Sequence, residues 1–129
     1  MEIVMEKLNR DSNKVQNVGI LSQKVISILG LNYSPKQILI GPSNIEHMKK
    51  KHPDCFDKYF EKIPEIISKP DYVGKHPSKD SIEYIKTFDE HILIAVRISQ
   101  SGNLYVRSLY EISPERLKSY LESGTTFKL

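Results

Sequence analysis

The sequence predicts an α+β protein, with N-terminal helices followed by an antiparallel β-sheet meander of about four strands and a C-terminal helix. Apolar residues recur at helical spacing in the first half of the chain, and β-rich runs separated by turn signals occupy residues 71–110. Ser113, Pro114 and Glu115 then form a helix start ahead of a last apolar stripe. Helices and strands are grouped rather than alternating, which separates this class from βαβ folds.

The helical half is divided by a glycine, a capping box and a proline. Gly30 suits the end of the first apolar-periodic stretch, and Ser43 with Glu46 matches the capping-box pattern. The residue before Pro53 is disfavoured in helical geometry. The expected helices therefore span residues 18–31, 43–51, 54–61 and 64–68, with a short strand at 37–40.

The strand half contains two turn signals, Asp89-Glu90 and Ser101-Gly102, which set a register for the strands around them. If both are two-residue turns, Leu93 lies opposite Lys86 on one side and Tyr110 on the other. Side chains alternate along a strand, so one face is predicted to carry an anion-binding set, Tyr84, Lys86, Arg97, Ser108 and Tyr110. The opposite face is predicted to be the core and carries Ile85, Ile92, Ile94, Val96, Ile98, Tyr105 and Leu109.

Composition bounds the class of protein. A length of 129 residues suits a single domain, which we expect at 18–129 after a poorly patterned extension at 1–17. A net charge of +3 and a pI near 8.9 permit nucleic-acid binding without requiring it. The single cysteine, Cys55, excludes an internal disulfide and is typical of a reducing, cytoplasmic location. No run of about 18 apolar residues is present, so no membrane span is expected.

Two histidines in the second predicted helix supply groups that transfer protons near neutral pH. His47 is the preferred general base, and His52 is its partner or alternate. A structural alternative stays open, because histidines near helix ends are commonly polar surface residues and His52 follows Met48 by four residues on the apolar stripe. The adjacent run of three lysines either forms a solvated face or follows a phosphate backbone.

Histidine, lysine, arginine and hydroxyl groups without paired carboxylates predict metal-independent cleavage of RNA. Metal-dependent nucleases gather Asp and Glu around Mg²⁺, whereas the predicted face has no carboxylate except at its edge, so no metal or other cofactor is expected. A base would remove the proton of a ribose 2′-OH, which attacks the adjacent phosphate to give a 2′,3′-cyclic phosphate. DNA lacks this nucleophile.

Several motifs support the same reading as a set. They are Gly41 to Met48 (GPSNIEHM) with His52-Pro53, Pro70 to Gly74 (PDYVG), Ile82 to Lys86 (IEYIK), Ile94 to Ser99 (IAVRIS) and Val106 to Tyr110 (VRSLY). Together they resemble the phage and mobile-element branch of the barnase, EndoU, colicin and RelE-like ribonuclease superfamily, over roughly residues 18–123. The resemblance implies a small α+β domain with a four-stranded antiparallel sheet. It also implies a metal-independent endoribonuclease, of toxin type, acting on tRNA, mRNA or rRNA.

Carried over position by position, the resemblance implies the catalytic residues His47, His52, Lys86, Arg97, Ser108 and Tyr110. The candidate RNA-contacting residues are Lys49, Lys50, Lys51, Tyr72, Lys75, Tyr84 and Ser99. A toxin that is delivered would act in the cytoplasm of its target cell. Whether an immunity protein or antitoxin accompanies the chain is left open.

Two alternatives also stay open. One is a catalytically silent RNA-binding or protein-interaction module of a mobile element, and the other is a regulatory protein whose partner is a protein. The position of the helix histidines decides between enzyme and binder, because a scissile phosphate must touch both the proton-transfer groups and the cationic ligands.

Overall fold

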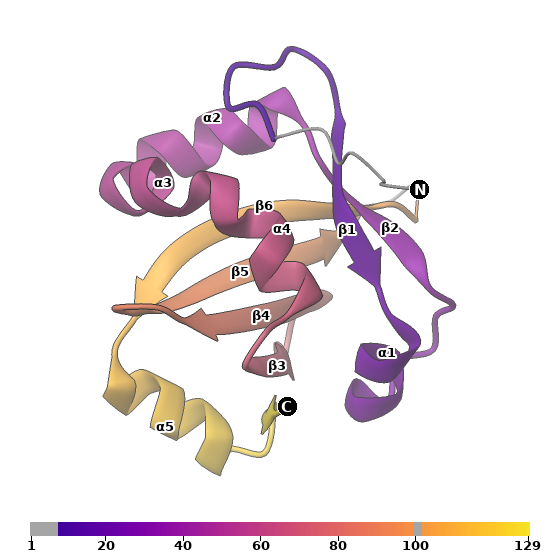
Figure 1. Ribbon diagram of the computed structural model, residues 1–129. Helices are drawn as coiled ribbons and strands as arrows, with labels where there is room; N and C mark the ends of the chain where they lie inside the picture. The colour runs from indigo at the N-terminus through magenta and orange to yellow at the C-terminus, as the bar shows by residue number, and fades with distance from the viewer. Residues whose placement is uncertain (1–7, 100–101) are drawn as a thin grey trace, which may run out of the picture.

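The structure is a computed structural model that describes residues 8–99 and 102–129. In this part of the chain a mixed seven-stranded sheet forms the centre, and helices flank it (Figure 1). The elements are β1 (Gln16–Leu21), α1 (Gln23–Leu29), β2 (Lys36–Ile40), α2 (Pro42–Lys51), α3 (Pro53–Tyr59), the 3₁₀ helix η1 (Phe60–Lys62), α4 (Ile63–Ser68), β3 (Tyr72–Lys75), β4 (Ser81–Thr87), β5 (His91–Ile98), β6 (Leu104–Ile112), α5 (Pro114–Glu122) and β7 (Thr126–Lys128). The strand order is β1-β2-β6-β5-β4-β3-β7, and among these described strands only the β2–β6 pair is parallel. Among the described residues no helix is both long and apolar enough to cross a membrane.

The α+β class and the C-terminal helix are confirmed, but the predicted four-stranded meander preceded only by helices is wrong. The stretch predicted as one helix at 18–31 divides into β1 and α1 at Ser22, whose side chain caps α1 by accepting the Val25 N–H at 3.3 Å. β1 pairs with β2, a partner about 20 residues away, so helical periodicity within one short window did not reveal it. α1 ends at Gly30, as expected, with φ of 63°.

Helix α2 begins one residue earlier than predicted and uses a different cap. Gly41 is the N-cap and Pro42 the first helical residue, and the Asn44 side chain accepts the Gly41 N–H at 2.8 Å. The N-cap bond is therefore made by Asn44 rather than by the Ser43 and Glu46 pair, and with glycine at the N-cap there is no reciprocal side-chain bond. The result matters for the site because the start of α2 lies beside β6.

The β4–β5 connection has three residues, Phe88 to Glu90, instead of the predicted two, since Thr87 pairs with His91. Contacts with α3 explain the longer turn. The Phe88 ring packs on Tyr59 with centroids 5.2 Å apart, and the Glu90 carboxylate accepts hydrogen bonds from Tyr59 Oη and from Lys58 Nζ at 3.2 Å.

This single extra residue moves every β4 side chain to the face opposite the predicted one. Glu83, not Tyr84, now lies opposite Ala95, and Ile85, not Lys86, lies opposite Leu93. The predicted common face is therefore wrong for Tyr84 and Lys86, and the predicted core face is wrong for Ile85.

The β5–β6 pairing follows the prediction for its first half and then changes. Leu93 lies opposite Tyr110 and Ala95 opposite Ser108, as expected. A β-bulge at Arg107 then brings Tyr105 opposite Arg97, so Tyr105 shares the face of Arg97 instead of the predicted core face. The predicted turn at Ser101-Gly102 includes a residue outside the described ranges.

The two faces of the sheet have different partners. The main core lies on the face that α2, α3 and α4 cover, where Met48, Phe56 and Phe60 pack against strand residues such as Ile94 and Val96. On the other face α5 covers only a small core, Ile85, Leu93, Ile112 and Leu117. Beyond this small core, the part of the second face formed by β4, β5 and β6 carries polar side chains such as Glu83, Arg97 and Ser108.

Candidate functional site

A pocket of about 340 Å³ opens on the sheet face that carries the small core. Its floor comes from β4, β5 and β6, and its rim from α2, the β3–β4 loop and α5. We call it the basic pocket. Its lining residues are His47, His76, Lys79, Ser81, Glu83, Ala95, Arg97, Arg107, Ser108, Tyr110, Arg116 and Tyr120.

The sheet topology explains how a residue of α2 reaches this pocket. β2 pairs with β6 only at Leu104 and Tyr105, so the later part of β6 has no strand on that side. Helix α2 packs along β6 there and lies at the edge of the sheet. His47, which is exposed on α2, consequently lines a pocket on the face opposite the main core.

Positive charge dominates the pocket. Six of its residues are basic, namely His47, His76, Lys79, Arg97, Arg107 and Arg116, against one carboxylate, Glu83. Within the described chain, the guanidinium groups of Arg97 and Arg107 form no salt bridge or hydrogen bond with another residue. Unpaired guanidinium groups that converge on a concavity suit a phosphate, which they bind through paired N–H donors.

Glu83 is the chemically distinctive residue of the pocket. Its side chain lies in the floor on β4, and the residue is only 8% exposed. Burial raises the pKa of its carboxyl, an effect that the nearby positive charges of His76 and Arg116 oppose. A carboxylate with a raised pKa is a stronger base than an ordinary one and suits proton abstraction near neutral pH.

Two histidines line the same pocket as Glu83: His76 in the β3–β4 loop and His47 on α2. The Ser78 backbone N–H donates to His76 Nδ1 at 3.2 Å, so in the neutral ring the proton lies on Nε2. This arrangement makes His76 a hydrogen-bond donor through Nε2. The His47 ring forms no such bond among the described residues, and both its nitrogens are available for proton exchange.

Tyr110 and Ser108 supply hydroxyl groups from β6. Burial first, and then the negative charge of Glu83, raise the pKa of Tyr110 to about 12, so its phenol stays protonated and can donate a hydrogen bond. The His52 ring stacks on Tyr110 with centroids 5.4 Å apart and an interplanar angle of 30°. On α5, Arg116 Nε donates to Tyr120 Oη at 2.8 Å, which holds the Arg116 side chain over the pocket.

The structure brings together four of the six catalytic candidates: His47, Arg97, Ser108 and Tyr110. His52 does not line the pocket but contacts Tyr110. Lys86 lies on the other face, where its Nζ donates to the Lys69 carbonyl at 2.8 Å.

The candidate RNA-contacting residues are more dispersed. Tyr84 is fully buried in the main core, and Tyr72 packs against the small core. Ser99 lines a neighbouring pocket that also contains Arg97 and Arg107. The exposed lysines of the set, which lie on α2 and β3 outside the basic pocket, are Lys49, Lys50, Lys51 and Lys75.

Sequence reasoning missed Glu83, His76, Lys79, Arg107, Arg116 and Tyr120. Glu83 was assigned to the wrong face because the β4–β5 turn is one residue longer than predicted, and Arg107 was missed because of the bulge. Arg116 and Tyr120 did carry a signal, since residues four apart lie on one face of a helix beside the apolar Leu117. His76 and Lys79 belong to a loop, whose position depends on the strands that it joins.

The donor set of the pocket fits an anion better than a divalent cation, because one carboxylate stands among six basic side chains. In the described ranges, His, Cys, Asp and Glu form no group of three or more that could hold a metal ion.

Comparison with protein families gives one match. A family model described as phage-Barnase-EndoU-ColicinE5/D-RelE like nuclease3 matches residues 15–119. Searches of curated proteins and of solved structures found no match.

Proposed function

Because the chain belongs to the family of phage-barnase-EndoU-colicin E5/D-RelE-like nucleases, we propose that it is a metal-independent endoribonuclease of toxin type. The observation that carries the proposal is the buried carboxylate of Glu83 among six basic side chains. This combination supplies a base, an acid and an anion site within one pocket, as cleavage through the ribose 2′-OH requires.

In the proposed reaction the Glu83 carboxylate accepts the proton of the 2′-OH. The 2′-oxygen attacks the adjacent phosphorus, the bond from phosphorus to the 5′-oxygen breaks, and the His47 imidazolium gives its proton to that departing oxygen. The products are a 2′,3′-cyclic phosphate and a 5′-hydroxyl. Glu83 thus replaces His47 as the proposed base, because its raised pKa and its buried position on the pocket floor suit that role better.

The remaining pocket residues stabilise charge. Arg97, Arg107 and Lys79 bind the non-bridging phosphate oxygens, on which negative charge grows in the transition state. The protonated Tyr110 phenol donates a further hydrogen bond, and Ser108 orients the phosphate beside it. His52 acts on the reaction only through its contact with the Tyr110 ring.

Incubation of the purified chain with RNA in EDTA tests the proposal. We expect cleavage that leaves 2′,3′-cyclic phosphate ends, and a matched substrate with hydrogen in place of the 2′-OH at the cut site should resist. Absolute dependence on Mg²⁺, 3′-hydroxyl ends or undiminished cleavage of the deoxy substrate would each contradict the mechanism. RNA that is bound but not cut would support the alternative of a silent RNA-binding module.

A further inference from the structure

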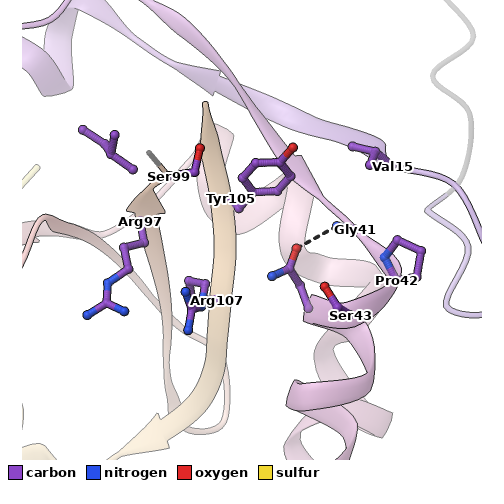
Figure 2. Close-up of a pocket in the computed structure, with 10 residues that line it drawn as sticks. Val15, Gly41, Pro42, Ser43, Arg97, Ser99, Tyr105 and Arg107 are labelled. Carbon is purple, nitrogen blue, oxygen red and sulfur yellow. Dashed lines mark hydrogen bonds between the residues drawn. The ribbon is translucent and has the colours of Figure 1, made fainter. Parts of the chain in front are cut away.

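A second pocket of about 330 Å³ adjoins the basic pocket, in the size range of small-molecule sites. It lies between the bulged part of β6 and the start of α2. Figure 2 shows the Tyr105 ring extending between these elements, with Pro42 and Ser43 on one side and the side chains of Arg97 and Arg107 on the other. We call it the Tyr105 pocket.

Arg97 and Arg107 line both pockets, so the Tyr105 pocket lies directly beside the proposed phosphate site. A phosphate bound by the two guanidinium groups would lie at the junction between the pockets. In RNA, the groups attached to a phosphate on either side are nucleosides. The Tyr105 pocket is therefore in the place where a nucleoside next to the reacting phosphate would lie.

The walls of the two pockets differ in a way that matches this placement. The basic pocket is lined mainly by charged side chains, whereas Val15, Pro42, Ile98 and the Tyr105 ring give the second pocket apolar and aromatic surface. Tyr105 is half-buried, so part of its side chain is packed against the protein and the rest presents surface to the pocket. Apolar surface around an aromatic ring suits the flat face of a nucleobase, which stacks on such rings.

Polar groups at one end of the Tyr105 pocket complete the match. The Asn44 amide oxygen accepts the Gly41 N–H at 2.8 Å, so the NH₂ group of that amide points away from this bond. Ser43 adds a hydroxyl group on the same turn of α2. A base has apolar faces and hydrogen-bonding groups along its edge, so a pocket that offers both an aromatic ring and polar side chains suits it.

Resting on the proposed function, we propose that the Tyr105 pocket binds the base of the nucleotide adjoining the scissile phosphate. The phosphate lies on Arg97 and Arg107, and the base stacks on Tyr105. The β-bulge at Arg107 creates this subsite, because it turns Tyr105 and Arg97 to the same face. With a regular ladder, Tyr105 would point into the main core.

Titration calorimetry on the full chain tests the subsite. The ligands are nucleoside 3′-monophosphates, nucleoside 5′-monophosphates and inorganic phosphate. We expect nucleotides to bind more tightly than inorganic phosphate. Whichever isomer binds more tightly, the 3′- or the 5′-monophosphate, shows on which side of the phosphate the base lies. Tyr105→Leu should weaken nucleotide binding by about 5- to 150-fold, the range found for loss of one base stack, and leave phosphate binding unchanged. Tyr105→Phe keeps the ring and should bind like the wild type.

Tyr33→Leu is the matched control, since Tyr33 is also half-buried and borders neither pocket. Nucleotides that bind no tighter than phosphate, or equal nucleotide affinity in wild type and Tyr105→Leu, would overturn the subsite. Tyr105-dependent nucleotide binding by a chain that does not cleave RNA would uphold the subsite and refute the enzyme. RNA cleavage whose KM is the same in wild type and Tyr105→Leu would uphold the enzyme and refute the subsite.

Discussion

Replacement of Glu83 by glutamine removes the proposed base and nearly preserves the shape of the side chain. Loss of a general base typically lowers the rate by roughly 10²- to 10⁴-fold, which corresponds to about 3 to 5 kcal/mol of lost transition-state stabilisation. We expect the loss in kcat, with little change in KM, because the arginines proposed to bind the phosphate are untouched. Glu111→Gln is the matched control, since Glu111 is exposed on β6 and lines neither pocket.

The pH profile of kcat/KM separates a catalytic role from a structural one. Glu83 acts as a base only when it is ionised, so activity should fall as the pH drops through its pKa, which burial raises above the ordinary value of 4.5. The assay is cleavage of a short RNA with a single ribose at the cut site, in EDTA, between pH 4 and 9. Glu83→Gln should lose this acidic limb, whereas Glu111→Gln should retain it.

As the pH rises, the contribution of Glu83 to the stability of the fold should fall while activity increases. The pKa of Glu83 is raised in the folded state, so the folded chain holds this proton to a higher pH than the unfolded chain does. Its contribution to stability is therefore favourable below pH 4.5 and is lost as the pH rises through the folded pKa. Glu83→Gln should be at least as stable as the wild type at pH 7. A variant with wild-type rate and an intact acidic limb, or one that unfolds at pH 7, would refute the reasoning.

Three further outcomes are expected. His47→Ala should lower kcat by roughly 10²- to 10⁴-fold in the same assay; an unchanged kcat would exclude it as the acid. Arg97→Ala should impair cleavage while Lys86→Ala stays near wild type, because Lys86 lies on the other face of the sheet; impaired cleavage in both variants would instead support the register predicted from sequence, which puts both residues on one face. Gly74→Ala should lower the thermal midpoint, since an added Cβ would lie 2.6 Å from Thr126 Oγ1 and 3.0 Å from a backbone carbonyl of the adjoining segment; an unchanged midpoint in thermal denaturation would mean that β7 does not pack as described.

The parts of the fold that local sequence determines were predicted well. Gly30, Pro53 and the Ser113-Pro114 pair end or start helices by their own backbone chemistry, and the structure has helix boundaries at or beside each of them. The pairing of Leu93 with Tyr110 also agrees with the prediction, although the pairs nearest the turn are one residue out of the predicted register. The bulge at Arg107 offsets that difference.

The remaining parts depend on contacts between distant segments. The three-residue turn follows from the packing of Phe88 on Tyr59 and from the bonds that Glu90 makes to α3, none of which a local pattern contains. One extra residue there was enough to exchange Lys86 for Glu83 on the site face. Ser108 and Tyr110 lie on the expected face because the predicted β5–β6 pairing is right at their positions. Tyr84 and Lys86 do not, because the predicted β4–β5 pairing is one residue out.

Glu83 is better explained by function than by stability. A carboxylate that is 8% exposed loses much of its hydration, and within the described chain it forms no salt bridge that would compensate. Its neighbours on the same face of the sheet, Ile85 and Leu93, belong to a small apolar core that an apolar residue at position 83 would extend. A buried carboxylate that costs stability at neutral pH and lines a pocket with unpaired arginines therefore supports the proposed phosphate-cleaving site over a purely structural role.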